Sequence, residues 1–122
     1  RDELTVVSDQ HGCPTSALDL ADALLAAAES WRSAPRGETY HLAGAGSTSW
    51  CGFAQAIMDE CRNLGLASAE VRPIPSREWP TKAARPADSR LDSTKFARDF
   101  DFTMPQWRDS LAAVMQRLAA ER

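Results

Sequence analysis

Hydrophobic residues recur at helical spacing in three long stretches of the chain, which predicts three amphipathic helices. The first is expected over residues 16–31, with an apolar stripe of Leu18, Ala21, Leu25 and Ala28. The second is expected over residues 50–64, with a stripe of Trp50, Phe53, Ala54, Ile57 and Cys61. Gly65 then occupies a C-cap position. The third begins at Pro105, with a stripe of Trp107, Leu111, Val114 and Leu118.

Shorter patterns complete the prediction. A brief helix is expected from Ser93 to Asp99, capped by Asp92 or Ser93. Runs of β-branched and apolar residues predict strands at Leu4–Ser8, Thr39–Ala43 and Glu70–Ile74. Strands interleaved with four helices indicate an α/β fold. Because both faces of a parallel sheet need cover, we expect at least one strand to complete a sheet supplied elsewhere.

Two stretches between these elements are expected to be loops. Asp9–Thr15 is punctuated by Gly12 and Pro14. Pro75–Pro86 is rich in proline and is expected to be ordered, because Trp79 would be costly to leave in solvent. The proline within Glu70–Ile74 marks that strand as an edge or a terminus.

Charge and composition narrow the class of protein. The 122 residues suit one soluble domain, and no apolar run approaches the length that spans a bilayer. The net charge is −3, yet residues 77–98 hold six basic and three acidic side chains. A local cationic segment in an acidic protein suits a small anion better than nucleic acid or a membrane, although composition alone favours a solvated face. Three cysteines without CxxC spacing indicate free thiols and a cytoplasmic location.

The chain shows no reaction centre of its own. Gly44 and Gly46 are the only closely spaced glycines, which is a weak signal for a dinucleotide-binding turn. A short-chain reductase needs a tyrosine followed four residues later by lysine, but Tyr40 is followed there by Gly44. His11 and His41 are scattered and suggest neither a hydrolase nor a metal site. We therefore expect no catalytic, cofactor-binding or metal-binding residue in this chain.

Read end to end, the sequence resembles the dTDP-4-dehydrorhamnose reductases, a family of extended short-chain dehydrogenases/reductases. The motifs that carry the resemblance are a DQxGxPT loop at 9–15, YHL at 40–42, SW at 49–50, and PTxAxRPxxSRLD at 80–92. They occur in the family's order across nearly the whole chain, and the first and last together are fairly specific.

The resemblance implies that residues 1–122 form the single C-terminal, substrate-binding domain of a longer protein. An N-terminal Rossmann half outside this chain would bind NADPH or NADH and carry the Tyr-Lys pair. The complete enzyme would reduce dTDP-4-dehydro-L-rhamnose to dTDP-L-rhamnose for cell-surface polysaccharide. We expect this chain alone to be inactive. The alternative is a non-catalytic sugar-nucleotide-binding or regulatory subunit with the same fold.

Two arginines are candidates for the diphosphate of a dTDP-sugar, because a planar guanidinium binds such an anion through two hydrogen bonds. By analogy with related reductases and epimerases, Arg85 in its RPxD context is the leading candidate, and Arg90 is the second. For Arg90 we favour a structural ion pair with Asp88 or Asp92.

Three further residues are candidates for the substrate site. Gln10 and Thr15 could hydrogen-bond a sugar or phosphate. The simpler roles are that Thr15 or Ser16 caps the next helix and that Asp9 fixes its turn through backbone amides. Trp79 could stack on a base or a sugar, although burial in the core is favoured. Trp50 and Trp107 are expected in the core.

Metal and oligomer expectations come from the resemblance alone. Some members are described as metal-dependent homodimers, held by carboxylates that include an acidic residue just after the PT motif. Here Ser16, Ala17 and Leu18 stand at that place, which argues against a bridging Mg²⁺. The resemblance implies a homodimer as a possible partner.

Overall fold

The computed structural model of the chain describes residues 2–33, 35 and 37–121. Its helices are α1 (Ala17–Ser33), α2 (Trp50–Asn63), α3 (Thr94–Phe100) and α4 (Trp107–Ala120), with a 3-10 turn, η1, at Ser76–Glu78. Its strands are β1 (Glu3–Val7), β2 (His11–Gly12), β3 (Thr48–Ser49) and β4 (Glu70–Ile74). The α/β class with few short strands is confirmed.

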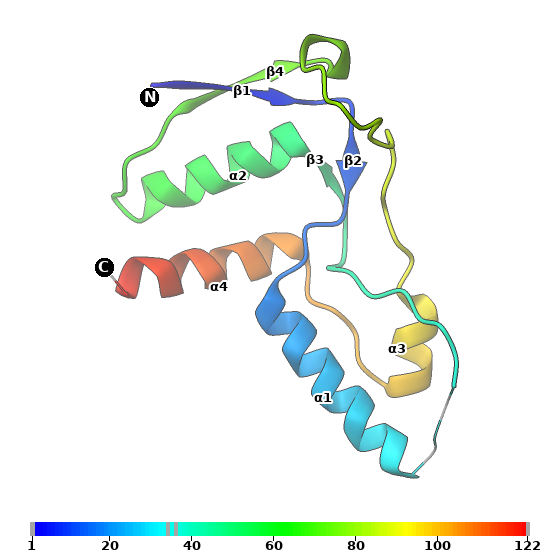
Figure 1. Cartoon of the computed structure of the whole chain (residues 1–122). Helices are drawn as coiled ribbons and strands as arrows, with labels where there is room; N and C mark the ends of the chain where they lie inside the picture. Colours follow the sequence, from blue (N-terminus) through cyan, green and yellow to red (C-terminus); the bar gives the residue numbers. More distant parts are fainter. Residues whose placement is uncertain (1, 34, 36, 122) are drawn as a thin grey trace.

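The strands form two small sheets. β1 and β4 run parallel, from Glu3 opposite Glu70 to Val7 opposite Ile74, and β2 pairs antiparallel with β3. In Figure 1, α2 lies along the β1–β4 pair and α4 lies along α2. Within the described part of the chain β4 pairs with β1 alone.

The prediction of a strand at Thr39–Ala43 is wrong. The structure has irregular backbone there, because no strand of the described residues runs beside it. Ala43 instead donates its amide to the Ser93 hydroxyl at 3.0 Å. The Ser93 side chain is thereby occupied, and the Asp92 carboxylate accepts from the Thr94 amide at the start of α3.

Two apolar clusters hold the helices. One joins α2 to α4 and is centred on Ala56, Trp107, Leu111 and Met115. The other joins α1 to α3 and is centred on Ala23, Phe96, Phe100 and Met104. The core position of Trp107 is confirmed, but that of Trp50 is wrong, since its side chain is 57% exposed. Trp50 is the first residue of α2, one position before the buried Cys51.

Helix ends and faces differ in detail from the predictions. Gly65 has a positive φ of 67°, as its C-cap role predicts. α4 begins at Trp107, two residues after Pro105, and its Leu118 is 51% exposed. The stripe predicted for α1 is wrong, because the helix buries Ala23, with Leu20 and Ala27 packed beside it, and leaves Leu25 65% exposed. The sequence predicts that residues 33–37 end α1, and of these, residues 34 and 36 lie outside the described residues.

Candidate functional site

Strand β2 joins the two motif-bearing segments of the chain. The His11 amide donates to the Ala87 carbonyl at 2.9 Å, and the Ser89 amide donates to the His11 carbonyl at the same distance. The Ser89 hydroxyl also donates to that carbonyl, at 3.1 Å. A side chain at Gly12 would meet this hydroxyl, since a Cβ there would lie 3.0 Å from the Ser89 oxygen. The loop at 9–15 and the proline-rich segment therefore lie side by side.

A second brace ties the same loop to η1. Both carboxylate oxygens of Asp9 accept from the Ser76 amide, at 2.9 and 3.0 Å, and one also accepts from the Ser76 hydroxyl at 2.6 Å. These hydrogen bonds lower the pKa of Asp9 below its ordinary value. The Gln10 amide donates to the same Ser76 hydroxyl at 2.9 Å. Asp9 thus accepts a backbone amide as predicted, but from distant η1 rather than from its own turn, and the relay from Gln10 through Ser76 to Asp9 fixes the Gln10 side chain.

These braces shape an open hollow of about 530 Å³, which we call the Arg85 hollow. One wall comes from β1, another from the start of α2, and the rest from the loops at 9–15 and 75–86. Its lining residues are Thr5, Val6, Val7, Gln10, Trp50, Trp79, Thr81 and Arg85. It combines a guanidinium, two indoles, an amide and two hydroxyls, and so it can bind a ligand that is both anionic and ring-bearing.

The two candidate arginines have different surroundings. Arg90 binds Asp88 through two hydrogen bonds, at 2.9 and 2.7 Å, which holds the pKa of that carboxyl far below its usual range. The structural ion pair expected for Arg90 is thus confirmed. Arg85 is exposed and forms no ion pair with any carboxylate of the described residues. Its guanidinium is therefore available to an external anion.

Thr15 lies outside the Arg85 hollow. Its hydroxyl donates to the Cys13 carbonyl at 2.9 Å and accepts from the Gly44 amide at 3.0 Å. Of the two caps predicted for α1, Thr15 and Ser16, it is Ser16 that acts, because its hydroxyl accepts from the Leu18 amide. Thr15 faces a neighbouring hollow of about 370 Å³.

Two tryptophans at the Arg85 hollow depart from the predictions. The prediction that Trp79 is buried in the core is wrong, because its side chain is 58% exposed and lines the hollow. Trp50 was missed as a site residue because helical periodicity assigned it to the core. The signal that could have found it is Ser49, whose hydroxyl caps α2 by accepting from the Gly52 amide at 3.1 Å. A residue next to a cap lies at a helix end, beside the adjoining loop.

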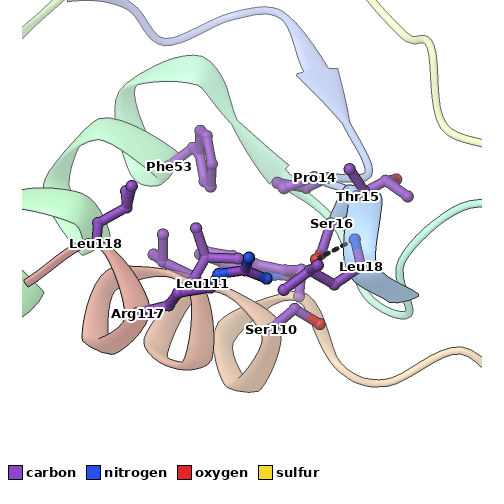
Figure 2. A pocket seen from close by; sticks show the side chains of 12 residues that line it. Pro14, Thr15, Ser16, Leu18, Phe53, Ser110, Leu111, Arg117 and Leu118 are labelled. Carbon is purple, nitrogen blue, oxygen red and sulfur yellow. Dashed lines mark hydrogen bonds between the residues drawn. The ribbon is translucent and has the colours of Figure 1, made fainter. Parts of the chain in front are cut away.

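A second cavity, of about 360 Å³, lies between the start of α1, α2 and α4 (Figure 2). Figure 2 shows that its walls are largely apolar, with Phe53 from α2 and Leu111 and Leu118 from α4. Arg117 is paired with Glu121, and Ser110 hydrogen-bonds Asp19. This cavity offers little to a diphosphate.

The Gly44–Gly46 turn does not fit a dinucleotide. A Cβ at Gly44 would lie 2.2 Å from the Pro14 carbonyl oxygen, and one at Gly46 would lie 2.8 Å from the Gln106 side chain. Gly46 also has a φ of 80°. The space beside the Cα atoms of these glycines is thus filled by other atoms of the chain, so a pyrophosphate cannot approach the backbone there.

Clusters of metal ligands and membrane-spanning helices are both absent from the described residues. Over 2–33, 35 and 37–121, no three His, Cys, Asp or Glu side chains come together as ligands for a metal ion. Within the same residues, no helix has the length and apolarity to cross a bilayer.

Comparisons with known proteins place the chain in one family. Residues 1–120 match the family model described as RmlD substrate binding domain. The dTDP-4-dehydrorhamnose reductase of Salmonella typhimurium is 41% identical over 110 residues, which are 88% of this chain and 37% of that protein. The Sinorhizobium fredii reductase is 37% identical over 98% of this chain and 42% of its own length.

Solved structures agree with the sequence matches. The chain superposes on the dTDP-4-dehydrorhamnose reductase of Bacillus anthracis, solved in complex with NADP, with a TM-score of 0.79 and 29% identity, over all of this chain and 39% of that one. For the Clostridium acetobutylicum reductase the TM-score is 0.79, the identity 32%, and the shares 97% and 39%. The chain therefore has the fold expected for this part of an extended short-chain reductase and spans well under half the length of these relatives.

Proposed function

Because the chain belongs to the RmlD substrate binding domain family, we propose that it is the sugar-nucleotide-binding part of a dTDP-4-dehydrorhamnose reductase. In this proposal, residues 1–122 are the single C-terminal domain and a Rossmann half elsewhere in the polypeptide holds the cofactor. The complete protein reduces dTDP-4-dehydro-L-rhamnose to dTDP-L-rhamnose, and bound NADPH supplies the hydride. NADP in the Bacillus anthracis structure favours NADPH over NADH.

The observation that carries this proposal is the chemistry of the Arg85 hollow. It gathers three of the five residues expected to bind substrate, Gln10, Trp79 and Arg85, although Gln10 is far from the other two in sequence. Arg85 has no carboxylate partner within the described chain, so a diphosphate can take both of its parallel N–H groups.

The rest of the hollow suits the two ring systems of the ligand. The exposed indoles of Trp50 and Trp79 offer flat apolar surfaces for a base or a sugar. The Gln10 amide, held by Ser76, can hydrogen-bond a hydroxyl or a carbonyl oxygen of the ligand. Binding and orientation are therefore the work of this chain, and it supplies no group that we assign to proton or hydride transfer.

Calorimetry with dTDP-L-rhamnose tests the assignment of Arg85 in the complete polypeptide. Arg85→Ala should weaken binding by about 1.5–3 kcal/mol, the usual scale for a charge-assisted hydrogen bond, which is about 10- to 150-fold in affinity. The affinity of Arg85→Lys should lie between those of the wild type and Arg85→Ala, because an ammonium keeps the charge but cannot form two parallel hydrogen bonds. Arg62→Ala, at the far end of α2, makes the same change of charge and should leave the affinity unchanged.

Unchanged affinity in Arg85→Ala would remove the hollow from the substrate site. The reaction itself is tested by NADPH oxidation, which the complete wild-type polypeptide should show with dTDP-4-dehydro-L-rhamnose. Binding of dTDP-L-rhamnose without any oxidation of NADPH would instead identify a non-catalytic binding subunit.

A further inference from the structure

The Gln10 side chain enters the Arg85 hollow with an amide whose orientation is set by its neighbours. Its Nε2 atom donates to the Ser76 hydroxyl at 2.9 Å, and that hydroxyl donates to the Asp9 carboxylate at 2.6 Å. An ionised carboxylate only accepts and a serine hydroxyl has one proton, so the Ser76 oxygen must accept from Gln10. The amide nitrogen of Gln10 therefore faces Ser76, and the two ends of the amide cannot exchange places.

The carbonyl end of the same amide is left for a ligand. Within residues 2–33, 35 and 37–121, no group donates to the Gln10 Oε1 atom. Gln10 is half-buried and lines the hollow together with Trp50. The Trp50 amide donates to the Gln10 backbone carbonyl at 3.3 Å, so the two side chains start from adjacent backbone. The hollow thus offers an exposed indole and, from the neighbouring segment, a hydrogen-bond acceptor with one N–H beside it.

An amide of fixed orientation discriminates only between ligand groups of fixed polarity. A sugar hydroxyl can rotate to donate or to accept, so either end of the amide would serve it equally. The edge of a base cannot rotate in this way: thymine and uracil donate from N3–H beside carbonyl oxygens, whereas cytosine accepts at N3 beside an amine. A Gln amide that is free to turn over could pair with both edges. Stacking on an aromatic ring with hydrogen bonds to this edge is how proteins read single bases.

We propose that Gln10 is a specificity-determining residue, whose Oε1 atom accepts a hydrogen bond from the ring N3–H of a thymine or uracil base stacked on Trp50. Asp9 and Ser76 are positioning residues, because they act on the base only through Gln10. The inference deepens the proposed function and rests on it, since a diphosphate bound by Arg85 is what brings the base into the hollow.

Calorimetry with free nucleoside diphosphates at pH 7 tests the inference in the complete polypeptide. The wild type should bind dTDP and dUDP with similar affinity and dCDP about tenfold more weakly, which is the scale of one hydrogen bond. Gln10→Ala should lower the ratio of dTDP to dCDP affinity by about fivefold or more. Gln10→Met, which keeps the length of the side chain, should do the same. Gln55→Ala, at an exposed position of α2 outside the hollow, is the matched control and should leave the ratio unchanged.

Variants of the two positioning residues give a result that damage to the fold would not give. Asp9→Asn supplies an amide that can donate to the Ser76 oxygen, which frees the serine proton for Gln10 and turns the Gln10 amide over. The affinity for dCDP should then rise while the affinity for dTDP falls. Ser76→Ala releases the Gln10 amide and should lower the ratio, whereas Ser76→Thr keeps a hydroxyl and should retain it.

An unchanged ratio in both Gln10 variants would overturn the inference, as would a wild type that binds dCDP as tightly as dTDP. A loss confined to dTDP-L-rhamnose, with dTDP unaffected, would also overturn it, because Gln10 would then face the sugar. Arg85→Ala should weaken dTDP and dCDP equally, since both carry the diphosphate. Unchanged binding in Arg85→Ala would remove the hollow from the substrate site and the inference with it, whereas failure of the Gln10 variants alone would leave the proposed function standing.

Discussion

The Arg85 hollow and the cavity of Figure 2 are both open spaces bordered by the same loop, but their walls differ in kind. The cavity, of about 360 Å³, takes Trp107 and Leu111 from the α2–α4 core as its lining. The hollow, of about 530 Å³, is lined by exposed indoles, an amide and a guanidinium without a carboxylate partner in the described chain. Volume does not distinguish the two spaces, whereas the chemistry of the lining does.

The two spaces also differ in what holds them open. Helix packing shapes the cavity, so its walls are part of the apolar core. Hydrogen bonds shape the hollow, through His11 to the segment at 87–89 and through Asp9 to Ser76. Substitutions at the two sites should therefore separate effects on stability from effects on ligand binding.

The largest effect on stability is expected at the wall of the cavity. Trp107 is 6% exposed and lies edge-on to Phe53, with ring centroids 5.9 Å apart. Trp107→Ala should lower the free energy of unfolding by about 3–5 kcal/mol, because it removes a buried indole and leaves a void. Urea unfolding followed by circular dichroism measures the loss.

Trp50→Ala is the matched control, since it deletes the same side chain from an exposed position. Its unfolding free energy should change by no more than about 0.5 kcal/mol, as is usual at surface sites. Equal losses of unfolding free energy in Trp107→Ala and Trp50→Ala would contradict the distinction between the packed wall of the cavity and the hydrogen-bonded wall of the Arg85 hollow.

A smaller effect, on affinity, is expected from Trp50 in the complete polypeptide. Trp50→Ala should weaken the binding of dTDP-L-rhamnose by about 1 kcal/mol, the scale of an aromatic contact beyond simple burial. Trp50→Phe should recover most of the affinity because it restores a flat ring. Calorimetry at matched melting temperatures measures both, and an unchanged affinity in Trp50→Ala would exclude the indole from the ligand's contacts.

Local patterns in the sequence predicted the parts of the fold that depend on near neighbours. Strands β1 and β4, helix α2 and the positive φ of Gly65 follow from short-range periodicity and caps. The Arg90–Asp88 pair is likewise local, since it joins residues two positions apart. These features need no knowledge of the rest of the molecule.

The wrong predictions share one cause: the sequence does not show which distant segment packs against a given helix face, strand or loop. Periodicity showed that α1 is apolar but could not say which of its two apolar sides meets α3. The strand expected at Thr39–Ala43 needs a neighbour that the described residues do not provide. The Arg85 hollow depends on long-range hydrogen bonds, such as the one from the Ser89 amide to the His11 carbonyl. The motif resemblance therefore named Gln10 and Arg85 without showing that both line one hollow, and it did not name Trp50.

The smallest effect is expected from acid, through the brace between Asp9 and Ser76. Hydrogen bonds from Ser76 lower the pKa of Asp9 in the folded chain below the value of about 4 that an unfolded chain gives it. The stability that this carboxylate contributes is therefore present above pH 4 and is lost as the pH falls through the folded-state value. Asp9→Asn removes the charge, so the difference in unfolding free energy between wild type and variant should be greatest near pH 7 and should shrink below pH 4. Urea midpoints across this range measure it, with the exposed Asp22→Asn as control, and a difference that stays constant with pH would show that the brace does not depend on the charge of Asp9.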